Sequence, residues 1–470
     1  MTSRAGIPAA PLGRGASAGL ATQHAPPLDL PFRFLAITVG ALVLLAGTSP
    51  WLVPLLLGSF YAPHLIAFVH LNTLGIIGAT IFGASYQLLP VVLQRPVLSE
   101  RLARGSWWLY VPGLLLFLSG FVLGLTAAIA AGGLLLVAAA ALYVVVAAGT
   151  LARAPYRDAV FWHIAAAICG LAAALGLGLL LAVSKRFGFL GGMTLRVLVA
   201  HAVLMIGGWV TPMLTGVAYR LVGMFTLSED YMRPSWAMTE LLLVVAGAWL
   251  LAGSLLLGLG RGTSTAGAMA WLAGVALFAM HLGHLYRHRR RRTFDVHVPF
   301  AATAVCFGLL AGLTAVAGLV SRRGPADPLW IAAGWWAIAG WAETAIQGFL
   351  YKIGTFLTWL HRYAPLAGRR RVPRLEELYG RRTALAGWIG WSAGVALGGV
   401  AVLAGSPRLA LAAAVALSAG ASAFVANAAR VGSHWHRPAP RTTREAHHHS
   451  RGGTLTDGLT PYEPVRGSNA

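Results

Sequence analysis

Hydrophobic residues dominate the chain in long, nearly unbroken runs that are separated by short polar segments. Each run is long enough for a helix to cross the roughly 30 Å hydrocarbon core of a bilayer. The runs lie at 32–49, 62–90, 106–127, 129–151, 159–183, 195–223, 237–258, 266–286, 297–319, 329–360, 383–404 and 408–429. The pattern therefore predicts an all-α integral membrane protein with twelve transmembrane helices.

A short pattern recurs along the chain at an almost constant interval. It consists of a glycine, two further residues, a tyrosine, a polar residue and an aliphatic residue. Its tyrosines are Tyr86, Tyr219 and Tyr351, which lie 133 and 132 residues apart. Four spans fit in one such interval, so the spacing indicates an internal repeat of four-helix units.

A second marker keeps step with the tyrosines. Asp29, Asp158 and Asp295 each open a hydrophobic run, at intervals of 129 and 137 residues. Together the two markers predict three pseudo-symmetric four-helix units within a membrane domain at 31–431. The expected repeats are 29–157, 158–294 and 295–431, and the polar tails at 1–30 and 432–470 are expected to be disordered and cytosolic.

Charge is distributed in a way that sets the topology. The net charge of +22 is large, but a nucleic-acid-binding protein would carry its arginines on one soluble face. Here the loops after even-numbered spans are rich in arginine and those after odd-numbered spans contain little. By the positive-inside rule, both termini lie in the cytosol of a prokaryote and the chain spans its cytoplasmic membrane. The expected environment is the lipid bilayer, and no nucleic acid is expected as a partner.

Histidines inside spans are candidates for chemistry, because an unpaired imidazole in the bilayer is costly. His70 and His201 occupy matching places in the second and sixth spans. By helix rise they lie about 24 and 27 Å from Tyr86 and Tyr219, near the outer face. Each is a candidate for haem or metal ligation, with a structural hydrogen bond as the alternative. His163 lies near the cytosolic end of the fifth span, and His163→Ala is expected to have little effect on haem binding.

A polar stripe marks the tenth span. Glu343, Gln347 and Tyr351 are spaced i, i+4 and i+8, so they share one helix face. A carboxyl group at mid-membrane is typical of a proton or ion path, and a hydrogen-bonded helix contact is the alternative. Arg220 and Lys352, which follow two of the repeat tyrosines, are interpreted as interfacial anchors that snorkel toward water, with ligand or proton handling as the alternative.

Twelve spans in three four-helix arcs, with a histidine near the outer end of the second and sixth spans, resemble subunit I of the haem-copper oxidase superfamily. That family includes cytochrome c oxidases and the related nitric-oxide reductases. The resemblance implies that His70 is an axial ligand of a low-spin haem, here haem b, and that His201 is a copper ligand. It also implies a role in respiratory electron transfer or in handling nitric oxide or another small gas, with a cytochrome c or a periplasmic redox subunit as partner.

The chain departs from this family at several ligand positions. The family's tenth span carries two haem-ligating histidines, whereas 331–341 has none, and the seventh-span pair of copper ligands is also missing from 236–245. Met205 stands where the oxidase branch carries a tyrosine. We therefore expect a divergent member that binds little copper and is not an oxygen reductase. The alternative is a transporter or chaperone for a metal, haem or a small solute that kept the scaffold.

Overall fold

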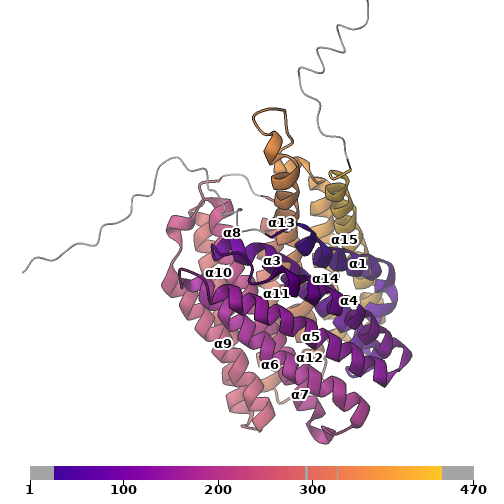
Figure 1. Cartoon of the computed structure of the whole chain (residues 1–470). Helices are drawn as coiled ribbons and strands as arrows, with labels where there is room; N and C mark the ends of the chain where they lie inside the picture. The colour runs from indigo at the N-terminus through magenta and orange to yellow at the C-terminus, as the bar shows by residue number, and fades with distance from the viewer. Residues whose placement is uncertain (1–25, 292–294, 325–326, 437–470) are drawn as a thin grey trace, which may run out of the picture.

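The computed structural model describes residues 26–291, 295–324 and 327–436. All regular elements in that part of the chain are helical, and the long helices lie side by side in one bundle (Figure 1). Eleven helical segments of the described residues are long and apolar enough to cross a membrane. The architecture is that of an all-α, multi-pass membrane protein whose environment is a lipid bilayer.

The eleven segments follow the expected hydrophobic runs. Those without a π-helical segment are α1 (Asp29–Leu52, continued by a 3₁₀ turn), α4 (Glu100–Leu123), α5 (Thr126–Leu151), α6 (Ala159–Phe187), α9 (Pro234–Leu257), α10 (Arg261–Arg287), α11 (His297–Val320), α14 (Arg381–Ala404) and α15 (Pro407–Ser433). The other two contain a π-helical segment between two α-helices. They are α2 (Pro63–His70), η3 (Leu71–Gly78) and α3 (Ala79–Val92), and α7 (Thr194–Val203), η5 (Leu204–Val210) and α8 (Thr211–Thr226).

The tenth expected span is helical but is not one of these eleven. It runs through α12 (Pro328–Trp335), the π-helical η7 (Trp336–Glu343) and α13 (Thr344–Arg362). Tryptophans and polar side chains, among them Gln347 and Lys352, lower the hydropathy of this helix. The total of twelve spans therefore stays a prediction.

The three π-helical segments lie at corresponding places in the chain. They begin at Leu71, Leu204 and Trp336, which are 133 and 132 residues apart, the same intervals that separate the repeat tyrosines. π-Helical turns are rare in proteins, and those that do occur are often found at functional sites. Because η7 contacts both η3 and η5, the three segments meet in the interior of the bundle.

The limits and packing of α6 illustrate how the sequence shapes these helices. The side chain of Asp158 accepts a hydrogen bond from the backbone N–H of Phe161 and so caps the start of α6. Gly188, at φ 72°, ends the helix in the left-handed conformation that glycine adopts at little cost. Midway along, Gly170 lies so close to the backbone of Gly208 in η5 that a Cβ atom there would overlap it.

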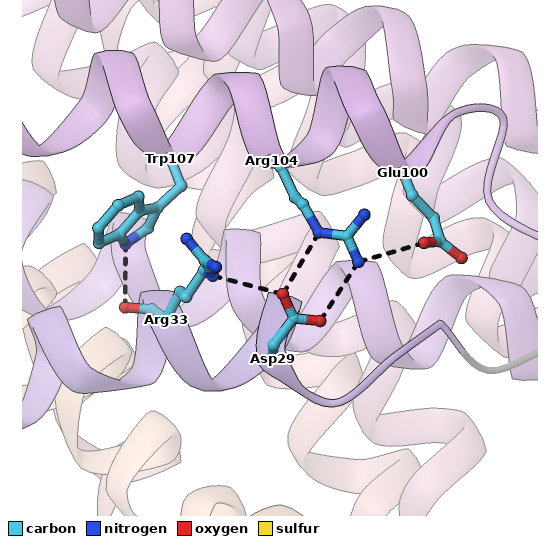
Figure 2. A network of polar contacts seen from close by, with 5 residues as sticks. All are labelled: Asp29, Arg33, Glu100, Arg104 and Trp107. Carbon is cyan, nitrogen blue, oxygen red and sulfur yellow. Dashed lines mark hydrogen bonds and ion pairs between the residues drawn. The ribbon is translucent and has the colours of Figure 1, made fainter.

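The three marker aspartates make different contacts. Figure 2 shows Asp29 bound by Arg104, with its two oxygens 3.3 Å from Nε and Nη2, while Arg33 and Glu100 complete the network. Trp107 donates to the carbonyl oxygen of Arg33 at 3.2 Å, so the starts of α1 and α4 are joined. Asp158 caps α6 as described above, and Asp295 pairs with a lysine of α13.

The chain ends only partly fall within the described residues. Residues 1–25 and 437–470, which make up most of the tails expected at 1–30 and 432–470, lie outside them. The last helix, α15, continues to Ser433, and Nδ1 of His434 lies 2.7 Å from the hydroxyl of Tyr363. Residues 432–434 are therefore part of the packed membrane domain.

Candidate functional site

His70 ends α2, immediately before η3. Its Nδ1 lies 2.8 Å from the carbonyl oxygen of Ile66, one turn earlier in the same helix. Because a carbonyl oxygen can only accept, Nδ1 carries the proton and Nε2 of the neutral ring presents its lone pair. The ring packs against Phe117 and Phe121 of α4, with centroids 5.0 and 6.2 Å away.

His201 occupies the corresponding place before η5 and is oriented in the same way. Its Nδ1 lies 2.8 Å from the carbonyl oxygen of Ala174 on the neighbouring helix α6. One turn further along α6, the ring lies on Gly178, where a Cβ atom would come within 2.8 Å of Cε1. Glycine at this position therefore makes room for the imidazole.

The two imidazoles form one candidate site at the expected outer end of the bundle. They lie close enough to interact electrostatically, and both side chains are half-buried. Within the described part of the chain, neither Nε2 has a hydrogen-bond partner. A ring held through Nδ1–H by a backbone carbonyl, with Nε2 left open, is how proteins orient a metal-ligating histidine.

Positive charge lies at the same end of α6. Lys185 follows Gly178 by two helical turns, which is about 10 Å along the same helix face. Its Nζ lies 3.9 Å from the centroid of the Tyr61 ring, in the segment that precedes α2. This contact joins the end of α6 to the segment that leads into α2.

The polar stripe of the tenth expected span is buried as a whole. Glu343 and Gln347 are 0% and 1% exposed, and no side-chain oxygen or nitrogen of either has a hydrogen-bond partner among the described residues. Tyr351 is also buried, and its hydroxyl accepts a hydrogen bond from Asn427 at 3.3 Å. The structure thus places the three on one enclosed face but gives a partner only to Tyr351.

The two basic residues beside the repeat tyrosines differ from each other. Arg220 is exposed, in agreement with an interfacial anchor. That prediction is wrong for Lys352, which is buried and forms an ion pair with Asp295. Burial raises the pKa of the Asp295 carboxyl, but the hydrogen bond and charge of Lys352 outweigh burial and hold that pKa below its ordinary value of 3.8.

A second polar cluster, at the opposite end of the bundle, was missed by the sequence reasoning. His163 is 0% exposed, and its Nε2 lies 2.8 Å from Oε2 of Glu240 on α9. The hydroxyl of Tyr219 donates to the same oxygen at 3.4 Å. A single acid inside an apolar span is the signal that could have revealed it. The expectation that His163→Ala has little effect on haem binding stays a prediction.

No group of three or more His, Cys, Asp or Glu side chains is placed to hold a metal ion, as far as the described residues extend. Cys169 and Cys306 are exposed and unpaired with each other. A copper site at His201 would therefore not find three ligands of these residue types within the described part of the chain. No model of a known protein family matches the chain, and no curated protein matches it significantly.

Proposed function

We propose that the chain crosses the cytoplasmic membrane of a prokaryote twelve times, in three four-helix units arranged as in subunit I of the haem-copper oxidases, with both termini in the cytosol. Three observations support the repeat. The π-helical segments recur at the intervals of the tyrosines. The third and fourth helices of each unit pack extensively on each other, as α4 on α5, α9 on α10 and α14 on α15. The repeat tyrosines are all buried.

We propose further that the outer site binds haem b, and that the protein acts in respiratory electron transfer or in handling a small gas such as nitric oxide. The observation that carries this proposal is the matched orientation of His70 and His201. Backbone carbonyls hold both Nδ1 atoms, and both Nε2 atoms lack a partner within the described chain. His70 is the primary candidate for an axial ligand, and His201 is either a second ligand or a metal ligand beside it.

The surrounding residues suit such a group. The carbonyl oxygens of Ile66 and Ala174 fix the two rings, Phe117 provides an apolar wall, and Gly178 makes room for the His201 ring. Lys185 could pair with a carboxylate directed toward the outer surface. A bound haem would supply one-electron chemistry or a gas-binding iron, tuned by its axial ligands and its surroundings. A cytochrome c or a periplasmic redox subunit would then be the electron-transfer partner at this face.

Transport is the second candidate function, and the stripe in the tenth helix favours it. Glu343 and Gln347 are enclosed, and their polar atoms have no partner in the described part of the chain. Such groups are costly unless a proton, a cation or a water satisfies them. A proton- or cation-coupled transporter or chaperone for a metal, haem or a small solute on the same scaffold would use them.

A series of histidine variants separates these two functions. The protein is expressed with ample haem supply, and the purified variants are compared by absorption spectroscopy. His70→Ala should remove or shift the Soret band while the protein still inserts, because loss of an axial ligand changes the spin state of the iron. His64→Ala is the matched control, since His64 is exposed at the start of the same helix. An unchanged spectrum in His70→Ala and His201→Ala would contradict ligation at this site.

A further inference from the structure

His281 and His284 lie on one face of the last turns of α10, and His288 follows directly after this helix, at the end expected to face the cytosol. His288 is exposed, His284 is half-buried and His281 is completely buried. The rings of His284 and His288 have centroids 4.4 Å apart. Trp236 of α9 packs on both His281 and His284, at 5.6 and 5.9 Å, so the imidazoles form a graded series from the surface to the interior.

The innermost histidine adjoins the His163–Glu240 pair. The ring of Tyr219 lies between them, with its centroid 4.9 Å from that of His281 and 5.5 Å from that of His163. The tyrosine hydroxyl and Nε2 of His163 both reach Oε2 of Glu240. By helix rise, Glu240 lies about 9 Å inside the start of α9.

Two polar atoms of this cluster are buried without a hydrogen-bond partner among the described residues, namely Oε1 of Glu240 and Nδ1 of His281. Nε2 of His281 accepts the backbone N–H of Arg233 at 3.2 Å, so the neutral ring carries its proton on Nδ1. The cluster therefore contains one donor, Nδ1 of His281, and one acceptor, Oε1 of Glu240, that are unsatisfied within the described chain. Water entering beside Tyr219 would satisfy both.

The His163–Glu240 contact holds one proton. Nδ1 of His163 donates to the carbonyl oxygen of Ala159 at 2.6 Å, so Nε2 has no second proton in the neutral ring. A single proton between Nε2 and Oε2 leaves the pair without net charge, which is the least costly state for a buried pair. The pair can receive a further proton only at Oε1, and it can release one only by becoming an anion.

We propose that these residues form a proton-uptake path from the cytosol to a buried proton-binding site at Glu240 and His163. His288 and His284 would pass protons inward from the surface, because a neutral imidazole can accept a proton at one ring nitrogen and release one from the other. His281 would accept a proton at Nε2 as the Arg233 contact opens, and it would release its Nδ1 proton to Oε1 of Glu240 through water that enters beside Tyr219. The ring thus gains one proton and loses one.

Other titratable and charged groups also lie near these rings. Tyr231 stacks on His288 with centroids 4.4 Å apart, and Arg233 and Arg287 are close enough to act electrostatically on His284. Asp230, next to Tyr231, is paired with Arg290 at 2.8 Å. The proposed proton path does not depend on haem binding at the opposite end of the bundle. An experiment can therefore reject the proton path or the haem site without affecting the other.

The test follows the shared proton by NMR of the full-length protein, labelled with ¹⁵N in its histidines and placed in lipid nanodiscs. The Nε2 signal of His163 is assigned by its loss in His163→Gln, and its exchange with deuterium is timed after transfer to D₂O. His281→Phe keeps an aromatic ring but removes the relay. It should slow exchange about a hundredfold, the lower range of what a positioned proton-transfer group contributes.

Surface variants and a control complete the experiment. The double variant His284→Asn and His288→Asn should slow exchange to a smaller extent, because water still reaches His281. If His281→Phe fails to insert into the membrane, the double variant still tests the proposal. His64 is an exposed histidine at the opposite end of the bundle, so the His163 proton should exchange at the wild-type rate in His64→Asn. An unchanged rate in His281→Phe, or a wild-type proton that does not exchange, would overturn the proposal.

Discussion

Replacing Lys352 by methionine would test the buried ion pair that ties the loop before α11 to α13. The side chains of Lys352 and Asp295 are only 11% and 7% exposed. Lys352→Met keeps most of the volume and removes the charge, so Asp295 loses its closest cationic partner. Arg291 remains, with Nη2 3.7 Å from the carboxylate, and it is also shared with Glu376.

The expected magnitude follows from burial. Removing one partner of a buried ion pair costs about 3–5 kcal/mol, because the other charge stays buried. Arg291, whose side chain is 36% exposed, compensates in part, so we expect a loss of about 3 kcal/mol in the free energy of unfolding. Adding Asp295→Asn removes the stranded charge. The double variant should therefore be more stable than Lys352→Met alone.

Reversible unfolding in mixed micelles, followed by circular dichroism, would measure these differences. The pKa of Asp295 is held below 3.8 in the folded protein, so its contribution is present above that ordinary value and is lost as the pH falls through the folded-state pKa. Wild type and Lys352→Met should therefore differ fully at neutral pH and converge in strong acid. A loss below about 1 kcal/mol at neutral pH, the value typical of an exposed pair, would refute the reasoning.

Two further predictions concern topology and oxygen chemistry. Reporter fusions placed after Ser321 and after Arg371 should report opposite sides of the membrane, because the 328–362 helix lies between them; reporters on the same side would contradict the tenth span and the repeat. The purified protein should consume no oxygen with a cytochrome c or quinol donor and should bind less than one copper per chain, because an oxygen-reducing site needs several imidazoles. Steady oxygen uptake that His201→Ala abolishes would refute this prediction.

The membrane-spanning helices were predictable because the length of an apolar run determines whether a helix can cross a bilayer. The expected run at 159–183 became α6, whose start at Ala159 follows directly from the capping aspartate. The tenth run was harder to classify, since its tryptophans are apolar in packing but lower its hydropathy. The π-helical segments could not be predicted, because they depend on how closely neighbouring helices approach.

The candidate sites were predictable only as single positions. Depth along a helix selected His70 and His201, but the contact of His201 with Ala174 depends on the space left by Gly178 on another helix. The partner of Glu240 is 77 residues away in the sequence, so no local pattern joins it to His163. Lys352 was misinterpreted for the same reason, because its partner Asp295 comes close only through tertiary packing.

The most direct test of the haem proposal is a reduced-minus-oxidised difference spectrum of the wild-type protein, purified from membranes with ample haem supply, with the haem content per chain measured on the same sample. The account predicts the α-band and Soret difference of a b-type haem, with at least one haem per chain that is lost or altered in His70→Ala. A colourless protein that is fully inserted and folded would contradict it and would favour transport.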